Sequence, residues 1–171
     1  MCIRDSPEPN SSAAGTRIIQ LLELFLAYDY KIIFGTTAKP TRYSFVLKSL
    51  GIKTKSLKLN DPTFDELILE MNPSIVLFDR FMTEEQFGWR VEKYCPNALR
   101  ILDTEDLHFL RNERSKNINS NLIFSKEFLK SDIAMREIAS IYRSDLSLII
   151  SEKEFHFLTD VIGIDSSLLL Y

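Results

Sequence analysis

A histidine and three acids form the most chemically capable cluster in this sequence. Asp103, Glu105, Asp106 and His108 come directly after the apolar run 98–102. The histidine could donate a hydrogen bond to a substrate or carry a proton near neutral pH, and the acids could contact the same ligand. Each residue also has a structural interpretation. Asp103 or Glu105 could cap the helix expected over 105–111, and His108 could be a half-buried ring held by a backbone carbonyl.

Two further polar pairs follow apolar runs. Asp79-Arg80 comes after the run 74–78, where it could supply a polar contact in a cleft or an ion pair that closes the strand end. Ser151-Glu152 comes after the run 146–150. There the serine could line the cleft or cap a helix, while the glutamate favours the positive end of the helix dipole.

The segment 11–17, SSAAGTR, reads as a loop of small residues that opens a helix. Ser11 or Ser12 could cap that helix. Ala13, Ala14 and Gly15 would allow a ligand to approach the backbone amides, as phosphates do at helix N-termini. A plain helix start, with small residues chosen for packing, is the alternative. The loop matches neither of the glycine-rich phosphate-binding patterns.

Apolar runs alternate with helical patterns along the chain. This alternation predicts parallel strands joined by right-handed crossovers. The expected fold is a Rossmann-like open parallel α/β sheet with helices on both faces. Lysines in the segment 52–59 mark it as an edge strand, and the continuous run SIVLF marks a central one. The expected strands are 30–34, 52–59, 74–78, 98–102 and 146–150, with a sixth at 167–171.

Helices are expected between these strands, at 18–27, 40–50, 62–71, 83–94, 122–130, 131–143 and 154–161. Their apolar faces repeat at helical spacing. Within them Phe87 and Trp89 are expected in the core, and Arg136 and Glu137 are expected to face water.

Both ends of the sequence look unusual. Residues 1–6, MCIRDS, are predicted to be a non-native leader that is not a strand, so the first strand of the sheet is expected to be missing or replaced. Residues 7–171 are predicted to be one domain. The chain stops at Tyr171 inside an apolar run, and we expect this domain to be truncated there.

Composition narrows the functional classes. The chain has 171 residues and a net charge of −3, which gives no bulk attraction to nucleic acid. No apolar run approaches the roughly 20 residues of a membrane-spanning helix. The two cysteines, Cys2 and Cys95, lack metal or redox spacing, and two histidines are too few for an obvious zinc site. A cytoplasmic protein with reduced thiols and no bound metal is expected.

The order of these pieces resembles the N-terminal domain of group 1 (family 4-like) glycosyltransferases, which have the two-domain GT-B architecture. The pieces are the AAGTR segment, the NPSIVLFDRF strand, the LDTEDLH strand-turn and the segment LSLIISEKE. The resemblance covers nearly the whole chain from Pro7. The first segment departs from the family because it lacks the usual paired glycines.

This resemblance implies the transfer of a sugar from a nucleotide-sugar to an acceptor. It gives Ala14, Gly15 and Thr16 the role of the first loop, near the donor phosphates, and it places His108 near the donor sugar as the catalytic residue. Asp79, Glu105, Asp106, Ser151 and Glu152 would line the substrate cleft. The family's second domain holds the nucleotide, so this half should be inactive alone, with no cofactor beyond the donor substrate. Peripheral association of the full-length protein with a membrane is also implied.

Two other classes compete with the transferase. A receiver-like domain that only binds a partner could use Asp79 as a phosphate acceptor, although no acid pair follows a first strand and no lysine follows a late one. A nucleotide-sugar epimerase or another Rossmann enzyme would need a glycine-rich fingerprint that the sequence lacks.

Overall fold

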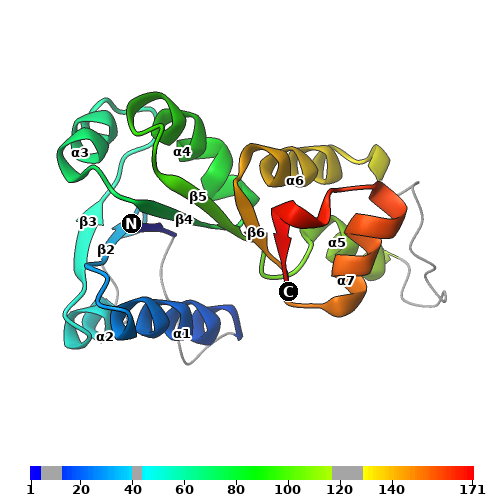
Figure 1. Ribbon diagram of the computed structural model, residues 1–171, viewed down its shortest axis with the longest axis horizontal. Helices are drawn as coiled ribbons and strands as arrows, with labels where there is room; N and C mark the ends of the chain where they lie inside the picture. The colour runs from blue at the N-terminus through cyan, green and yellow to red at the C-terminus, as the bar shows by residue number, and fades with distance from the viewer. Residues whose placement is uncertain (5–12, 40–43, 117–128) are drawn as a thin grey trace. The chain divides into compact units, whose positions relative to one another are not determined.

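The part of the chain that the structure describes is a mixed α/β structure with seven short parallel strands (Figure 1). The computed structural model describes residues 1–4, 13–39, 44–116 and 129–171. The strand order is β3-β2-β1-β4-β5-β6-β7. The strands are β1 (Cys2–Ile3), β2 (Ile33–Thr36), β3 (Lys53–Ser56), β4 (Ile75–Asp79), β5 (Leu99–Asp103), β6 (Leu146–Leu148) and β7 (Leu169–Leu170).

The described helices alternate with the strands as predicted. They are α1 (Ala13–Ala27), α2 (Ser44–Ser49), α3 (Thr63–Met71), α4 (Phe81–Tyr94), α5 (His108–Lys116), α6 (Asp132–Arg143) and α7 (Glu152–His156). A π-helical turn, Phe157–Ile162, continues α7, and a 3₁₀ turn, Ser166–Leu168, precedes β7. The Rossmann-like α/β class is confirmed. The expected starts at Ser11, Ser12 and Pro40 and most of the expected helix 122–130 lie outside the described residues.

The first strand departs from the sequence prediction. Cys2–Ile3 is a strand, it pairs in parallel with β2, and both of its residues are buried. The Met1 amine donates to the carbonyl of Ile75 at 2.7 Å, and the Leu77 amide donates to Met1 at 2.8 Å, which ties this segment to β4. The expectation that this segment is not a strand is therefore wrong, and Cys2–Ile3 fill the place of the first strand.

The chain divides into two compact units. Unit 1 comprises residues 1–77 and 90–98, and unit 2 comprises 78–89 and 99–171. In unit 1, helices α1 and α2 lie on one side of strands β1 to β3, and α3 lies on the other (Figure 1). Strand β3 is the edge strand that its lysines predicted, and all four of its residues are exposed.

Helix α3 is held in unit 1 by Arg90, whose side chain is only 6% exposed. Its Nε and Nη2 atoms donate to the two carboxylate oxygens of Asp65 at 2.5 and 2.8 Å, and its guanidinium lies 6.0 Å from the centre of the Phe64 ring. A two-point pair of this kind fixes geometry as well as charge. It joins the first turn of α3 to the last turns of α4.

Because of the Arg90–Asp65 pair, we expect part of the free energy of unfolding to be lost at low pH. Hydrogen bonds from Arg90 hold the pKa of Asp65 below its ordinary value of 3.8. A depressed pKa in the folded state stabilises the fold above the unfolded pKa and ceases to do so as pH falls through the folded value. Asp65→Asn should therefore cost about 1–2 kcal/mol between pH 5 and 8. The difference from wild type should shrink below about pH 4, measured by urea unfolding.

Glu70→Gln is the matched control, because Glu70 is exposed on the same helix. It should differ little from wild type across the range. A cost for Asp65→Asn that stays constant down to pH 2 would show that the carboxylate charge does not contribute.

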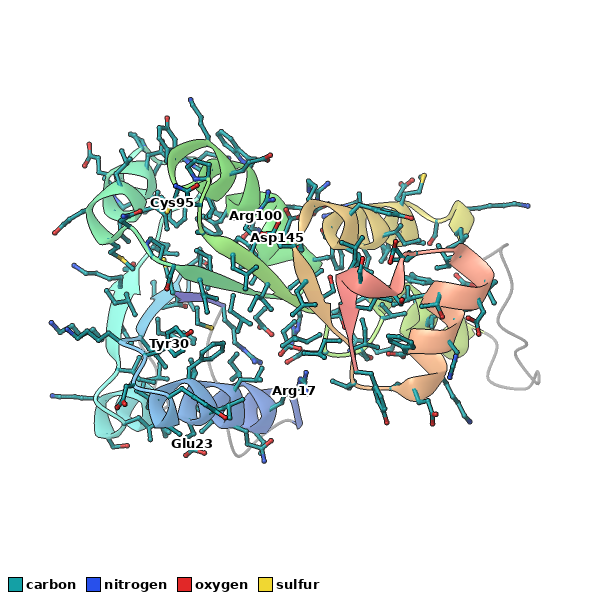
Figure 2. The ribbon with its side chains drawn as sticks, viewed as in Figure 1. Arg17, Glu23, Tyr30, Cys95, Arg100 and Asp145 are labelled. Atoms are coloured by element: carbon teal, nitrogen blue, oxygen red, sulfur yellow. The ribbon has the colours of Figure 1, made fainter. Side chains whose placement is uncertain are left out.

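In unit 2, strands β5, β6 and β7 pair in parallel. Figure 2 shows Arg100 and Asp145 together at the amino ends of β5 and β6. Asp145 accepts from the Arg100 amide at 2.8 Å and from its Nη2 at 3.0 Å. Burial raises the pKa of Asp145, but the hydrogen bonds and charge of Arg100 outweigh it and leave that pKa below its ordinary value.

Helix α4 packs beside α6 through two ion pairs, Arg143–Glu84 and Arg136–Glu85. Phe87 is buried as predicted, whereas Trp89 is 50% exposed, so its expected place in the core is wrong. Helix α4 also starts at Phe81, two residues before the expected start at 83. Residues two positions apart point to nearly opposite sides of an α-helix, so Phe87 and Trp89 cannot both face the core.

A second prediction concerns Gly88. The effect of Gly88→Ala on stability should change sign when the Glu84 side chain is removed. A methyl group on Gly88 would overlap the carboxylate of Glu84, and that side chain is 3% exposed and paired with Arg143. Alanine in a helix interior gains about 1 kcal/mol over glycine, but displacing a buried charged partner costs more. Gly88→Ala should thus destabilise by about 1 kcal/mol in wild type. In a Glu84→Ala background it should stabilise by about 1 kcal/mol.

Urea unfolding of the four proteins checks both signs at once. Destabilisation by the same amount in both backgrounds would mean that contacts other than Glu84 oppose the methyl group.

Candidate functional site

The candidate site lies at the carboxyl ends of the strands in unit 2. Hydrogen bonds join the residue after β4 to the last residue of β5, and the residue after β5 to the last residue of β6. The Arg80 amide donates to the Asp103 carbonyl at 2.8 Å, and both the amide and the hydroxyl of Thr104 donate to the Leu148 carbonyl, at 3.3 and 2.9 Å. In parallel sheets this edge is the usual place for a ligand. The polar residues predicted after each strand therefore share one edge of the unit.

At this edge, an ion pair joins two residues whose backbones have an unusual conformation. Arg80 Nε lies 2.7 Å from Glu105 Oε2, and the two side chains are 30% and 7% exposed. Both residues have left-handed backbones, with φ of 69° for Arg80 and 57° for Glu105. Residues other than glycine seldom adopt this conformation, at a cost of about 1–3 kcal/mol each, and such strain concentrates at functional sites.

Two of the predicted acids, Glu105 and Asp106, form ion pairs that the sequence did not suggest. Glu105 pairs with Arg80, and α5 begins only at His108, so the expected helix start at 105 and its capping by Asp103 or Glu105 are wrong. Asp106 instead forms a surface pair with Arg111 at 3.1 Å. Exposed pairs of this kind contribute about 0–1 kcal/mol, so Asp106 is available to a ligand at little cost.

Asp79 and Asp103 end strands β4 and β5 and are both buried, with 4% and 0% exposure. A phosphate-accepting aspartate must be open to solvent and to its phosphodonor. The burial of Asp79 therefore weighs against the receiver-like interpretation. It equally means that Asp79 would reach a substrate only through a neighbouring side chain.

His108 is the first residue of α5, and its side chain is 11% exposed. The Phe81 ring lies edge-on to the imidazole, with centroids 5.5 Å apart and planes at 76°. Nδ1 is buried 3.4 Å from Glu137 Oε1, without the alignment of a hydrogen bond. The neighbour of the ring is therefore a carboxylate, whereas the sequence suggested a backbone carbonyl.

Glu137 is the residue of this region that the sequence analysis missed. It was expected to face water, and this is wrong, because Glu137 is 1% exposed. Its two carboxylate oxygens accept from the amides of His108 and Phe109 at 3.0 and 3.1 Å. The acid therefore satisfies the positive end of α5. This helix N-terminus is occupied by the protein's own carboxylate and does not offer those amides to a substrate anion.

Ser151 and Glu152 have the structural roles described as alternatives. The Ser151 hydroxyl accepts from the Glu154 amide at 3.4 Å and caps α7, while Glu152 is exposed in the first turn of that helix. The cap confirms one interpretation of Ser151.

Ala14, Gly15 and Thr16 belong to unit 1, and the other predicted site residues belong to unit 2. All three lie within α1, because this helix begins at Ala13. The expectation that they form a loop before the helix is therefore wrong. Gly15 is buried and Thr16 is exposed.

Among the residues that the structure describes, no group of three or more histidines, cysteines or acids is placed to hold a metal ion. No helix in the same part of the chain is long and apolar enough to cross a membrane. Comparison with protein-family models gave no match to the chain, and comparison with curated proteins gave none either.

Proposed function

We propose that this chain is the acceptor-side half of a two-domain glycosyltransferase, which moves a sugar from a nucleotide-sugar to an acceptor in the cytoplasm. His108 would act at the reacting sugar. The nucleotide would be held by a second domain, so this half would bind the acceptor and shape the cleft without turning over substrate alone. No metal or further cofactor is part of the proposal.

The observation that carries the proposal is the strained polar edge of unit 2. Arg80 and Glu105 are left-handed and paired at the carboxyl ends of two parallel strands, next to the turn that leads to His108. Sugar transfer produces a diphosphate leaving group and needs a proton to be managed at the acceptor. Oriented donors and a histidine can serve those needs without a metal.

The test is sugar transfer by the whole gene product. The gene should be read past Tyr171, and the full protein should be assayed for the release of nucleoside diphosphate from a panel of nucleotide-sugars. We expect a second domain that binds at least one donor, and release that increases with the right acceptor. An unrelated following domain, or a full-length protein that binds none of the donors, would contradict the proposal.

A further inference from the structure

We propose that Glu137 is a positioning residue for His108: its carboxylate keeps the hydrogen of the imidazole on Nδ1 and leaves Nε2 as the nitrogen that meets a ligand. The use of Nε2 on a sugar substrate rests on the proposed function. The assignment of the hydrogen to Nδ1 does not, because it follows from the contacts of two residues in unit 2.

The backbone and the ring of His108 face the same carboxylate. Glu137 Oε1 accepts from the His108 amide at 3.0 Å and lies 3.4 Å from Nδ1, and Oε2 accepts from the Phe109 amide at 3.1 Å. The Glu137 side chain is only 1% exposed, so water competes little for hydrogen bonds to its carboxylate. Its position is thus fixed by two backbone donors before the imidazole is considered.

The charge of Glu137 decides which nitrogen carries the hydrogen. An ionised carboxylate only accepts hydrogen bonds, and a neutral imidazole has one nitrogen that donates and one that accepts. If Nδ1 were the accepting nitrogen, its lone pair would face a buried anionic oxygen at 3.4 Å. With hydrogen on Nδ1, the same approach is attractive, and a small rotation of the ring aligns it as a hydrogen bond.

A second contact to the ring comes from Phe81 of α4, which residues of α6 hold in turn. Phe81 packs edge-on against the imidazole. The Arg136 guanidinium lies 5.3 Å from the centre of the Phe81 ring, and the Ser140 hydroxyl lies 3.4 Å from the Phe81 carbonyl oxygen, within hydrogen-bond distance. Helix α6 therefore supplies the carboxylate beside Nδ1 and also contacts the aromatic ring that packs against the imidazole.

The experiment is nitrogen-15 NMR of the imidazole rings in the 171-residue chain, at a pH where the histidines are neutral. The chain has two histidines, so His156→Gln assigns the signals. We expect wild-type His108 to carry its hydrogen on Nδ1. Glu137→Met removes the acceptor and should reduce the Nδ1–H population several-fold, while His156, which is 60% exposed, stays unchanged.

Hydrogen on Nε2 of wild-type His108 would overturn the proposal, and so would a folded Glu137→Met protein with an unchanged His108 spectrum. If Glu137→Met does not fold, the wild-type spectrum alone decides. None of these readings needs a sugar. An Nδ1–H histidine in a full-length protein that transfers no sugar would therefore count against the proposed function and leave the role of Glu137 intact.

Discussion

For the proposed transferase, replacing His108 with alanine in the full-length protein is expected to slow sugar transfer about 10²–10⁴-fold, the range found for a lost acid–base group. His108 is the first residue of helix α5, and 11% of its side chain is exposed. The measurement is kcat for the release of nucleoside diphosphate, with the donor saturating. His156→Ala is the matched control, because its ring is 60% exposed on α7 and should matter less than twofold.

A buried ring also contributes packing, so loss of fold must be separated from loss of chemistry. His108→Gln keeps the side chain's polarity and most of its volume, and it should leave the melting temperature close to that of wild type while kcat still falls. Equal rates for His108→Ala and His156→Ala would show that His108 has no catalytic role. A fall in rate that tracks the melting temperature across the variants would assign it a structural role.

Most of the strands were predictable from local patterns, although the strand expected at 30–34 spans Ile33–Thr36. The run SIVLF became β4, buried from Val76 onward, and the lysine-rich segment became the exposed edge strand β3. Strand β1 was not predictable from its own residues. It has two residues, and its place between β2 and β4 is set by pairing with distant strands, which no local pattern records.

The sequence predicted where the site lies, but it did not predict which residues contact one another there. Polar residues after a strand must lie at its carboxyl end, so the turns at Asp79 and Asp103 were found from order alone. The partner of Glu105 was not, because the pair with Arg80 requires two left-handed residues, and nothing in an arginine or a glutamate signals that conformation. Tertiary structure overrode local preference at this point.

The sequence around Glu137 does indicate that this residue is buried. It is three residues after Ala134 and four before Ile141, and both of these are fully buried on α6. An acid in an apolar stripe must either interrupt the core or have a buried partner. The helix that it caps begins 29 positions earlier in the chain, so the partner could not be named from the sequence.

The loss of that acid should have the largest effect on stability. Glu137→Ala leaves the first amides of α5 without an acceptor inside the protein, where water cannot readily replace the carboxylate. A lost cap and two lost hydrogen bonds to a charged group should together cost about 3 kcal/mol. For a chain of this size, that corresponds to a fall in melting temperature of roughly 6–12 °C, which calorimetry or circular dichroism would measure.

Glu85→Ala gives the comparison, because Glu85 is also a glutamate paired across α4 and α6, with 24% of its side chain exposed, and its partner Arg136 is 51% exposed. An exposed pair of this kind contributes about 0–1 kcal/mol, so this variant should melt within a few degrees of wild type. Glu137→Gln should fall between the two, because its amide can accept one of the two backbone hydrogen bonds. Equal melting temperatures for Glu137→Ala and Glu85→Ala would mean that α5 is stabilised by its apolar face and not by this cap.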